Sequence, residues 1–192
     1  MFLGDDMFLE TLILATIIIF FLKNKDTKNL LYFKFNNLYL VIIGIIILIL
    51  INIFSSFYVK NISEFIINKY FLFHIISLVL ISIGLISNYK NIGFLIVGFG
   101  IFLNTIPIIF NKKMPVSLDA LLKINNNKII KIITENQSLS HGVFDKPKFY
   151  FLSDIIPLIK PWGNSVVISF GDILICIGLI ISLIYIVKSG SE

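Results

Sequence analysis

The 192-residue chain contains no arginine, one cysteine and one tryptophan, and only 14% of its residues are charged. Without arginine, it lacks the planar fork that binds phosphate or carboxylate through two hydrogen bonds. The lone Cys176 excludes an internal disulfide, and no cluster of cysteine and histidine predicts a zinc site. The sixteen basic residues, all lysines, are scattered and form no basic stripe of the kind that binds nucleic acid. We therefore predict no metal, no cofactor and no nucleic-acid partner.

Long hydrophobic runs dominate what is present, since 57% of the residues are hydrophobic. A helix of about 20 apolar residues crosses a bilayer. The sequence predicts an all-α, polytopic membrane helix bundle forming a single membrane domain. The first expected span is the shortest and contains Glu10. The five expected spans are residues 7–22, 39–59, 70–87, 92–110 and 165–187.

The long connection, residues 111–164, is too polar to span a membrane and too apolar to be a plain linker. We expect it to contain short interfacial or re-entrant helices. Ser117 is placed to cap a helix that runs through Lys123. Residues 128–135 carry apolar pairs at helical spacing, which predicts a helix lying on the membrane surface.

The second half of this connection contains an apolar segment, residues 149–159, that is too short to cross a bilayer. Ser153 is expected to cap a half-helix that begins at Asp154, with Pro157 tolerated in its first turn. Trp162 is of the type that sits at the level of lipid headgroups. The segment is therefore predicted to be re-entrant or interfacial.

The distribution of the lysines gives evidence on how the protein is oriented in the cell membrane. The tail before the first span carries Asp5 and Asp6 and no lysine, whereas residues 23–38 carry four lysines. The positive-inside rule then places the N-terminus and the long connection outside the cytoplasm and the C-terminus inside. The eight lysines of the long connection favour the opposite orientation.

Polar residues within the expected spans gather in one leaflet, on the side of the long connection, if consecutive spans alternate in direction. Polar groups at membrane depth face a bundle interior or a wet cavity. We therefore expect a polar pocket roofed by the long connection. The alternative is that these residues only join helices to one another. In chain order they are Glu10, Asn52, Ser55, Ser56, His74, Ser77, Asn104, Asn111, Ser165, Ser169 and Asp172.

The last span holds the most informative of these residues. A carboxylate such as Asp172 costs about 2.5–3.5 kcal/mol at membrane depth, so it marks a site. Ser165, Ser169, Asp172 and Cys176 recur at the spacing of one helix face. We predict that this face is turned into the bundle.

Two acids are best placed for chemistry, Asp154 and Asp172. Paired carboxyl groups in a low-dielectric site share one proton and divide the roles of acid and base. His141 is a candidate base or headgroup ligand, or else a solvated loop residue. Lys112 and Lys113 are candidates for binding a phosphate headgroup, with lysines that merely snorkel to the interface as the alternative.

Four sequence elements resemble a family of bacterial integral membrane proteins catalogued only as a domain of unknown function. They are Asn-x-x-Met-Pro-Val at residues 111–116, a loop histidine at His141, Asp-x-Ile-Pro-Leu at residues 154–158 and Ser-x-Gly-Asp-x-Leu-Ile at residues 169–175. Their order and spacing fit across nearly the whole chain.

The chain departs from that pattern at three positions. Lys112 and Lys113 replace the glycines usual after the asparagine, and Ser153 replaces a glycine before the first aspartate. The resemblance implies a membrane protein and no established activity.

A weaker resemblance is to signal peptidase II, the lipoprotein signal peptidase, whose second catalytic aspartate lies in Asn-x-Ala-Asp-x-x-Ile-x-x-Gly on its last helix. Asp172 would be that residue and Asp154 the first aspartate. The chain departs at Ser169 for Asn, at Gly171 for Ala and at Ile155 for an Arg. The resemblance is one of geometry, with two aspartates near one membrane face, and does not by itself imply common chemistry.

Two functions remain open. The favoured one is a protein in contact with membrane lipids that binds a lipid headgroup or a membrane protein partner through the polar pocket. The alternative is an intramembrane hydrolase or transferase that acts on a lipid or lipoprotein, with Asp154, Asp172 and His141 as catalytic residues. A transporter is not favoured because five spans show no inverted repeat.

Overall fold

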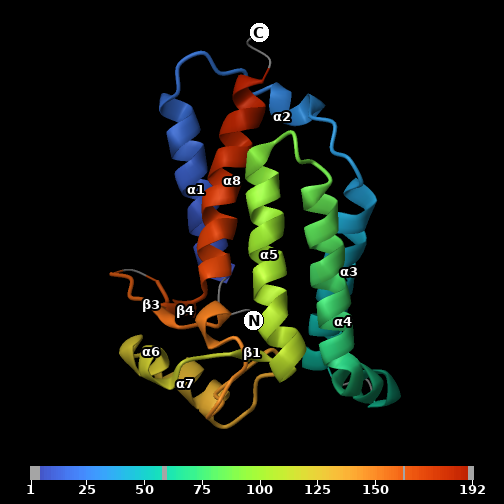
Figure 1. Cartoon of the computed structure of the whole chain (residues 1–192), viewed down its shortest axis with the longest axis vertical. Coiled ribbons are helices and arrows are strands. Elements are labelled where there is room, and N and C mark those ends of the chain that lie inside the picture. Colours follow the sequence, from blue (N-terminus) through green and yellow to red (C-terminus); the bar gives the residue numbers. More distant parts are fainter. Residues whose placement is uncertain (1–4, 58–59, 162, 190–192) are drawn as a thin grey trace.

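The computed structural model describes residues 5–57, 60–161 and 163–189. Five apolar helices in these residues form a bundle with a small cap at one end (Figure 1). Four of them are long and apolar enough to cross a membrane, and α1 is shorter. The predicted all-α membrane helix bundle is therefore confirmed. The five are α1 (Asp5–Phe21), α3 (Leu38–Ser56), α4 (Lys60–Ile86), α5 (Ile92–Asn111) and α8 (Phe170–Lys188).

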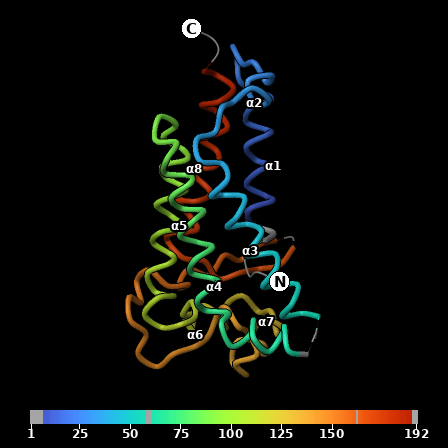
Figure 2. Tube along the Cα trace, turned by 90° about the vertical axis from the view of Figure 1, so that its right-hand side faces the viewer, coloured from blue at the N-terminus to red at the C-terminus, as the bar shows by residue number. Residues whose placement is uncertain are grey.

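The helices lie in a curved row in which α3 packs on α4, α4 on α5, α5 on α8 and α8 on α1. A short helix, α2 (Asn29–Tyr32), sits at the end of the bundle opposite the cap (Figure 2). Large apolar side chains cover the outer faces, most densely on α3. Each helix satisfies its own backbone hydrogen bonds, as a segment in hydrocarbon must.

Glycines let α5 and α8 approach closely. A Cβ on Gly178 would lie 2.8 Å from the carbonyl oxygen of Gly93, and one on Gly171 would lie 2.6 Å from that of Gly100. Small residues permit such contact between membrane helices. The close approach places the start of α8 beside the second half of α5, where the candidate site lies.

The long connection folds into the cap. Ser117 accepts a hydrogen bond from the backbone of Ala120, which confirms it as the cap of α6 (Leu118–Lys123). A helix also forms at α7 (Asn127–Thr134), close to the predicted range. Its apolar residues Ile129, Ile130 and Ile133 pack against a buried cluster within the cap. That cluster contains Val116, Ala120, Leu121, Ile124 and Val167.

Short strands complete the cap. In one pair, β1 (Met114–Pro115) runs parallel to β2 (His141–Gly142). In the other, β3 (Ile156–Leu158) runs antiparallel to β4 (Val166–Ile168). A single bridge between Val116 and Asp154 connects the segment after β1 to the segment before β3. A 3-10 turn, η1 (Tyr150–Leu152), precedes Asp154.

Two predictions for this region are wrong. Asp154 begins no half-helix, because residues 156–158 pair as a strand with β4 and Pro157 lies opposite Val167. Ser165 does not share a helix face with Asp172, because α8 begins only at Phe170. The apolar run before that point is strand β4, whose three residues are all buried. The interfacial prediction for Trp162 and the predicted end of the second span at Val59 lie outside the described residues.

Candidate functional site

The segment Met114–Ser117 is the centre of the candidate site. One of its edges pairs with the strand that holds His141, since the amide of Met114 donates to the carbonyl of Ser140. The other edge pairs with Asp154, whose amide donates to the carbonyl of Pro115. His141 and Asp154, which are far apart in sequence, therefore flank a single strand.

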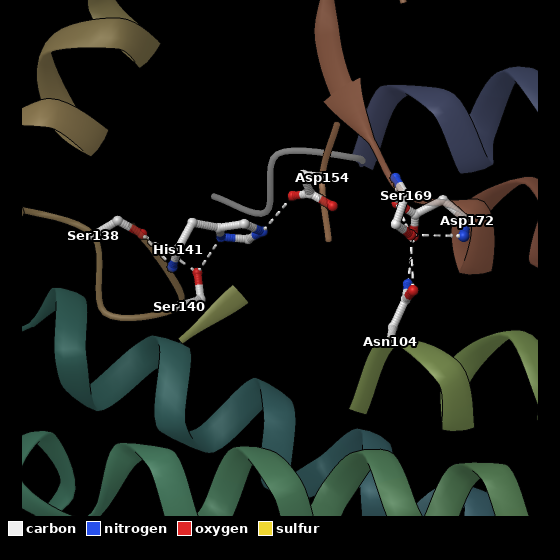
Figure 3. Close-up of polar contacts among 7 residues, drawn as sticks. All are labelled: Asn104, Ser138, Ser140, His141, Asp154, Ser169 and Asp172. Carbon is white, nitrogen blue, oxygen red and sulfur yellow. Dashed lines mark hydrogen bonds and ion pairs between the residues drawn. The ribbon is translucent and has the colours of Figure 1, made fainter. Parts of the chain in front are cut away.

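The two side chains meet at this strand. His141 Nε2 lies 3.5 Å from Asp154 Oδ2, and their side chains are only 14% and 5% exposed. On the other side of the ring, His141 Nδ1 lies 2.7 Å from the hydroxyl of Ser140. The backbone amide of His141 donates to Ser138 Oγ at 3.1 Å. These contacts fix the imidazole with one nitrogen turned toward the carboxyl group (Figure 3).

Burial controls the charge of the pair. It lowers the pKa of His141 to about 3, and the nearby His74 and Lys113 act in the same direction. It raises the pKa of Asp154 well above the usual 3.8, and the charge of Asp172 raises it further. Desolvation disfavours the charged form of each group. The arrangement favours a carboxylic acid beside a neutral imidazole over a buried ion pair.

Asp172 is held by a separate hydrogen-bond network. Its Oδ2 accepts from the amide and the hydroxyl of Ser169, both at 2.9 Å, and its Oδ1 accepts from Asn104 Nδ2 at 2.8 Å. The Ser169 hydroxyl also lies 2.7 Å from Asn104 Oδ1. Ser169 and Asp172 together make the capping box of α8. Both carboxyl oxygens of Asp172 therefore support the helix start and its contact with α5.

A cavity of about 400 Å³ lies between the helices and the cap. Its wall comes from α1, α3, α4, α5, α8 and the strands of the cap. Sixteen of the described residues line it, and eleven of these are apolar, among them Leu78, Ile101 and Ile175. The other five are His74, Asn104, His141, Asp154 and Asp172. The wall of the cavity is therefore mostly apolar, and these five side chains form its polar part.

Several candidate residues have structural partners instead. Asn111 ties the end of α5 to the cap, because its side chain bonds the carbonyl of Pro107 and both backbone groups of Lys148. Lys112 is exposed and ends α5 with φ +67°, a conformation that favours glycine. Lys113 donates to Asn136 Oδ1 at 2.7 Å.

Two further candidates lie apart from the cavity. Asn52 donates to the carbonyl of Leu48 on its own helix at 2.8 Å. Glu10 forms an ion pair of 2.7 Å with Lys160, which joins α1 to the loop after β3. Neither residue lines the cavity. The polar groups of both side chains therefore have partners within the protein.

Sequence reasoning missed the serines that hold His141 and most of the cavity wall. Ser138 and Ser140 stand directly before His141, and that local Ser-x-Ser-His pattern was the available signal. The apolar lining gave no signal, because leucine and isoleucine occur both on the outer faces of the helices and on the cavity wall. Within the described residues, no group of three or more His, Cys, Asp or Glu side chains is placed to hold a metal ion.

Comparison with known proteins identifies a family and nothing more specific. Residues 32–184 match a family described as a family of unknown function, DUF5317. No curated protein and no solved structure matches the chain. The match begins within the segment before α3 and extends through most of α8, so it covers the bundle core and the whole cap. The chain therefore belongs to this family of unknown function.

Proposed function

We propose that the protein binds a membrane amphiphile in the cavity between the helices and the cap. The observation that carries this proposal is the composition of the cavity wall, which is apolar except for five side chains. Ligand pockets of about 300–1,000 Å³ with few polar groups are typical of small-molecule sites. The apolar part of the ligand would contact residues such as Leu78 and Ile101, and its polar end would contact His141 and Asp154.

Filling the cavity tests this proposal. In Leu78→Trp a larger side chain enters the cavity from α4, whereas in Ile76→Trp the same change falls on the 47% exposed outer face of that helix. We expect the wild type and Ile76→Trp, purified in detergent, to retain an amphiphile that native mass spectrometry detects. Leu78→Trp should lose it while keeping the helical circular dichroism of the wild type. Equal retention by all three proteins, or retention by none, would refute the proposal.

The contact between His141 and Asp154 favours a second candidate, a hydrolase or transferase that acts on the bound lipid. A fixed imidazole beside a buried carboxyl group is suited to general acid–base catalysis. A carboxyl dyad like that of signal peptidase II is less well supported, because both oxygens of Asp172 already accept hydrogen bonds. Turnover of a lipid ester that Asp154→Asn abolishes, with binding retained, would establish this candidate. Binding without turnover would leave only the first.

We propose the orientation with the cap outside the cytoplasm. The cap and the loop that follows α1 lie at opposite ends of the bundle (Figure 1). In a Cys176→Ser background, Lys123→Cys in the cap and Lys28→Cys near α2 provide a test at two exposed positions. A membrane-impermeant maleimide applied to intact cells should label the first and not the second. The reverse pattern would overturn the orientation.

A further inference from the structure

The charged residues around the cavity indicate which class of ligand it can bind. The chain has sixteen lysines, yet among the side chains that the structure describes no lysine lines the cavity. Two acids lie on the wall, and Asp172 would repel an anion when it is charged, whereas protonated Asp154 supplies no positive charge to balance one. An anion buried without a paired cation or several donors is strongly disfavoured in a low-dielectric site. A phosphate group would therefore meet two carboxyl groups and no ammonium group on the wall.

The lysine that acts electrostatically on the site is already engaged. Lys113 affects His141, but its ammonium group bonds Asn136 Oδ1 and the carbonyl of Ser138. Both partners belong to the segment between α7 and β2, on the cap side of the site. Two of the three N–H donors of Lys113 are thus used on the cap side, and Lys113 does not line the cavity.

The polar side chains that face the cavity suit a neutral oxygen. Both oxygens of Asp172 already accept hydrogen bonds from Ser169 or Asn104, so we assign the contact with a ligand to Asp154 and His141. A carboxylic acid supplies one donor and an acceptor, and a neutral imidazole supplies one of each across its two nitrogens. A hydroxyl or carbonyl oxygen fits that set without transferring a charge into the cavity.

We infer that the occupant of the cavity is an uncharged amphiphile, an acyl or isoprenoid chain that ends in a hydroxyl or carbonyl oxygen, and that this oxygen hydrogen-bonds Asp154 or His141. This inference rests on the proposed function and specifies its ligand class. It replaces the phosphate headgroup that Lys112 and Lys113 suggested in the sequence, since neither lysine lines the cavity.

Matched pairs of probes test the inference. Farnesol with farnesyl phosphate, and oleyl alcohol with oleyl phosphate, differ only in the charged group. Binding of each to the full-length protein in detergent is measured by native mass spectrometry and by the shift in thermal unfolding. We expect each alcohol to bind at least about tenfold more tightly than its phosphate, in the wild type and in Ile76→Trp. Leu78→Trp should lose the binding.

Other outcomes separate the two claims. If the phosphates bind as tightly as the alcohols or more tightly, and Leu78→Trp abolishes that binding, the inference is overturned and the proposed function stands. If no probe binds, or if Leu78→Trp binds as well as Ile76→Trp, both the proposed function and the inference fail. Asp154→Leu and His141→Leu add a check on the polar contact, because at least one of them should weaken alcohol binding about tenfold. An unchanged affinity in both variants would contradict the assigned contact.

Discussion

Removing one member of the His141–Asp154 pair should change how stability depends on pH. The unfolded chain protonates a histidine below about pH 6.5, but buried His141 stays neutral down to about pH 3. In that window the unfolded state binds one more proton than the folded state. Asp154 acts in the opposite sense, because above about pH 3.8 its folded form keeps a proton that the unfolded form has lost. Between about pH 4 and 6.5, the wild-type pair therefore contributes almost nothing to the change of the free energy of unfolding with pH.

Each single variant exposes the contribution of the remaining partner. In Asp154→Asn only His141 titrates, so the free energy of unfolding should rise with pH by about 1.4 kcal/mol per unit, relative to the wild type. Over two pH units the difference amounts to about 2.7 kcal/mol. In His141→Gln only Asp154 titrates, so stability should fall by a similar amount per unit until the pH reaches the folded-state pKa of Asp154.

The assay is unfolding by SDS in mixed micelles, followed by circular dichroism between pH 4 and 6.5. Other carboxylates contribute equally to all three proteins, so the slopes are compared as differences from the wild type. Infrared spectroscopy adds the protonation state directly, since a protonated Asp154 gives a carboxylic acid carbonyl band that Asp154→Asn lacks. If both variants keep the wild-type slope, the two groups are solvated and the buried pair does not exist.

Three further predictions concern the packing that holds the site. Gly171→Ala should lower the free energy of unfolding by about 1–3 kcal/mol, because its Cβ would overlap the Asn104 side chain. Ile177→Ala, on the exposed face of α8, should lower it far less when both variants are compared by thermal unfolding. Lys112→Gly should stabilise the protein by about 1 kcal/mol, since glycine adopts the left-handed backbone at this position without strain. An unchanged midpoint of thermal unfolding would refute that explanation. Glu10→Gln should lower the free energy of unfolding by about 1–3 kcal/mol, because it leaves the 7% exposed Lys160 side chain without its anion. In a double-mutant cycle, the double variant with Lys160→Met should recover most of that lost stability.

The sequence predicted the helices well because their signal is local. Apolar runs near the length of a bilayer became α3, α4, α5 and α8, and Ser117 began α6 as its side-chain chemistry requires. The start of α8 was misplaced because Val166, Val167 and Ile168 are as suitable for a buried strand as for a membrane helix. Hydropathy alone does not distinguish these two structures.

The geometry of the site was less accessible from sequence because it depends on contacts between distant segments. His141 and Asp154 meet because two very short strands pair with opposite edges of residues 114–117. Strands of two or three residues carry no periodic signal, and their register is fixed by tertiary packing. Asp172 was singled out from the sequence, but its part in the capping box of α8, with Ser169 as the N-cap, required knowing that the helix begins at Phe170.

The most direct test of the account is a crystal structure of the wild-type protein grown from a lipidic mesophase. We expect elongated density in the cavity beside Leu78, with a terminal oxygen within hydrogen-bonding distance of Asp154 or His141. A cavity closed by side chains, or a ligand whose polar end lies against Lys112 or Lys113 outside it, would contradict the claim that an uncharged amphiphile occupies this site.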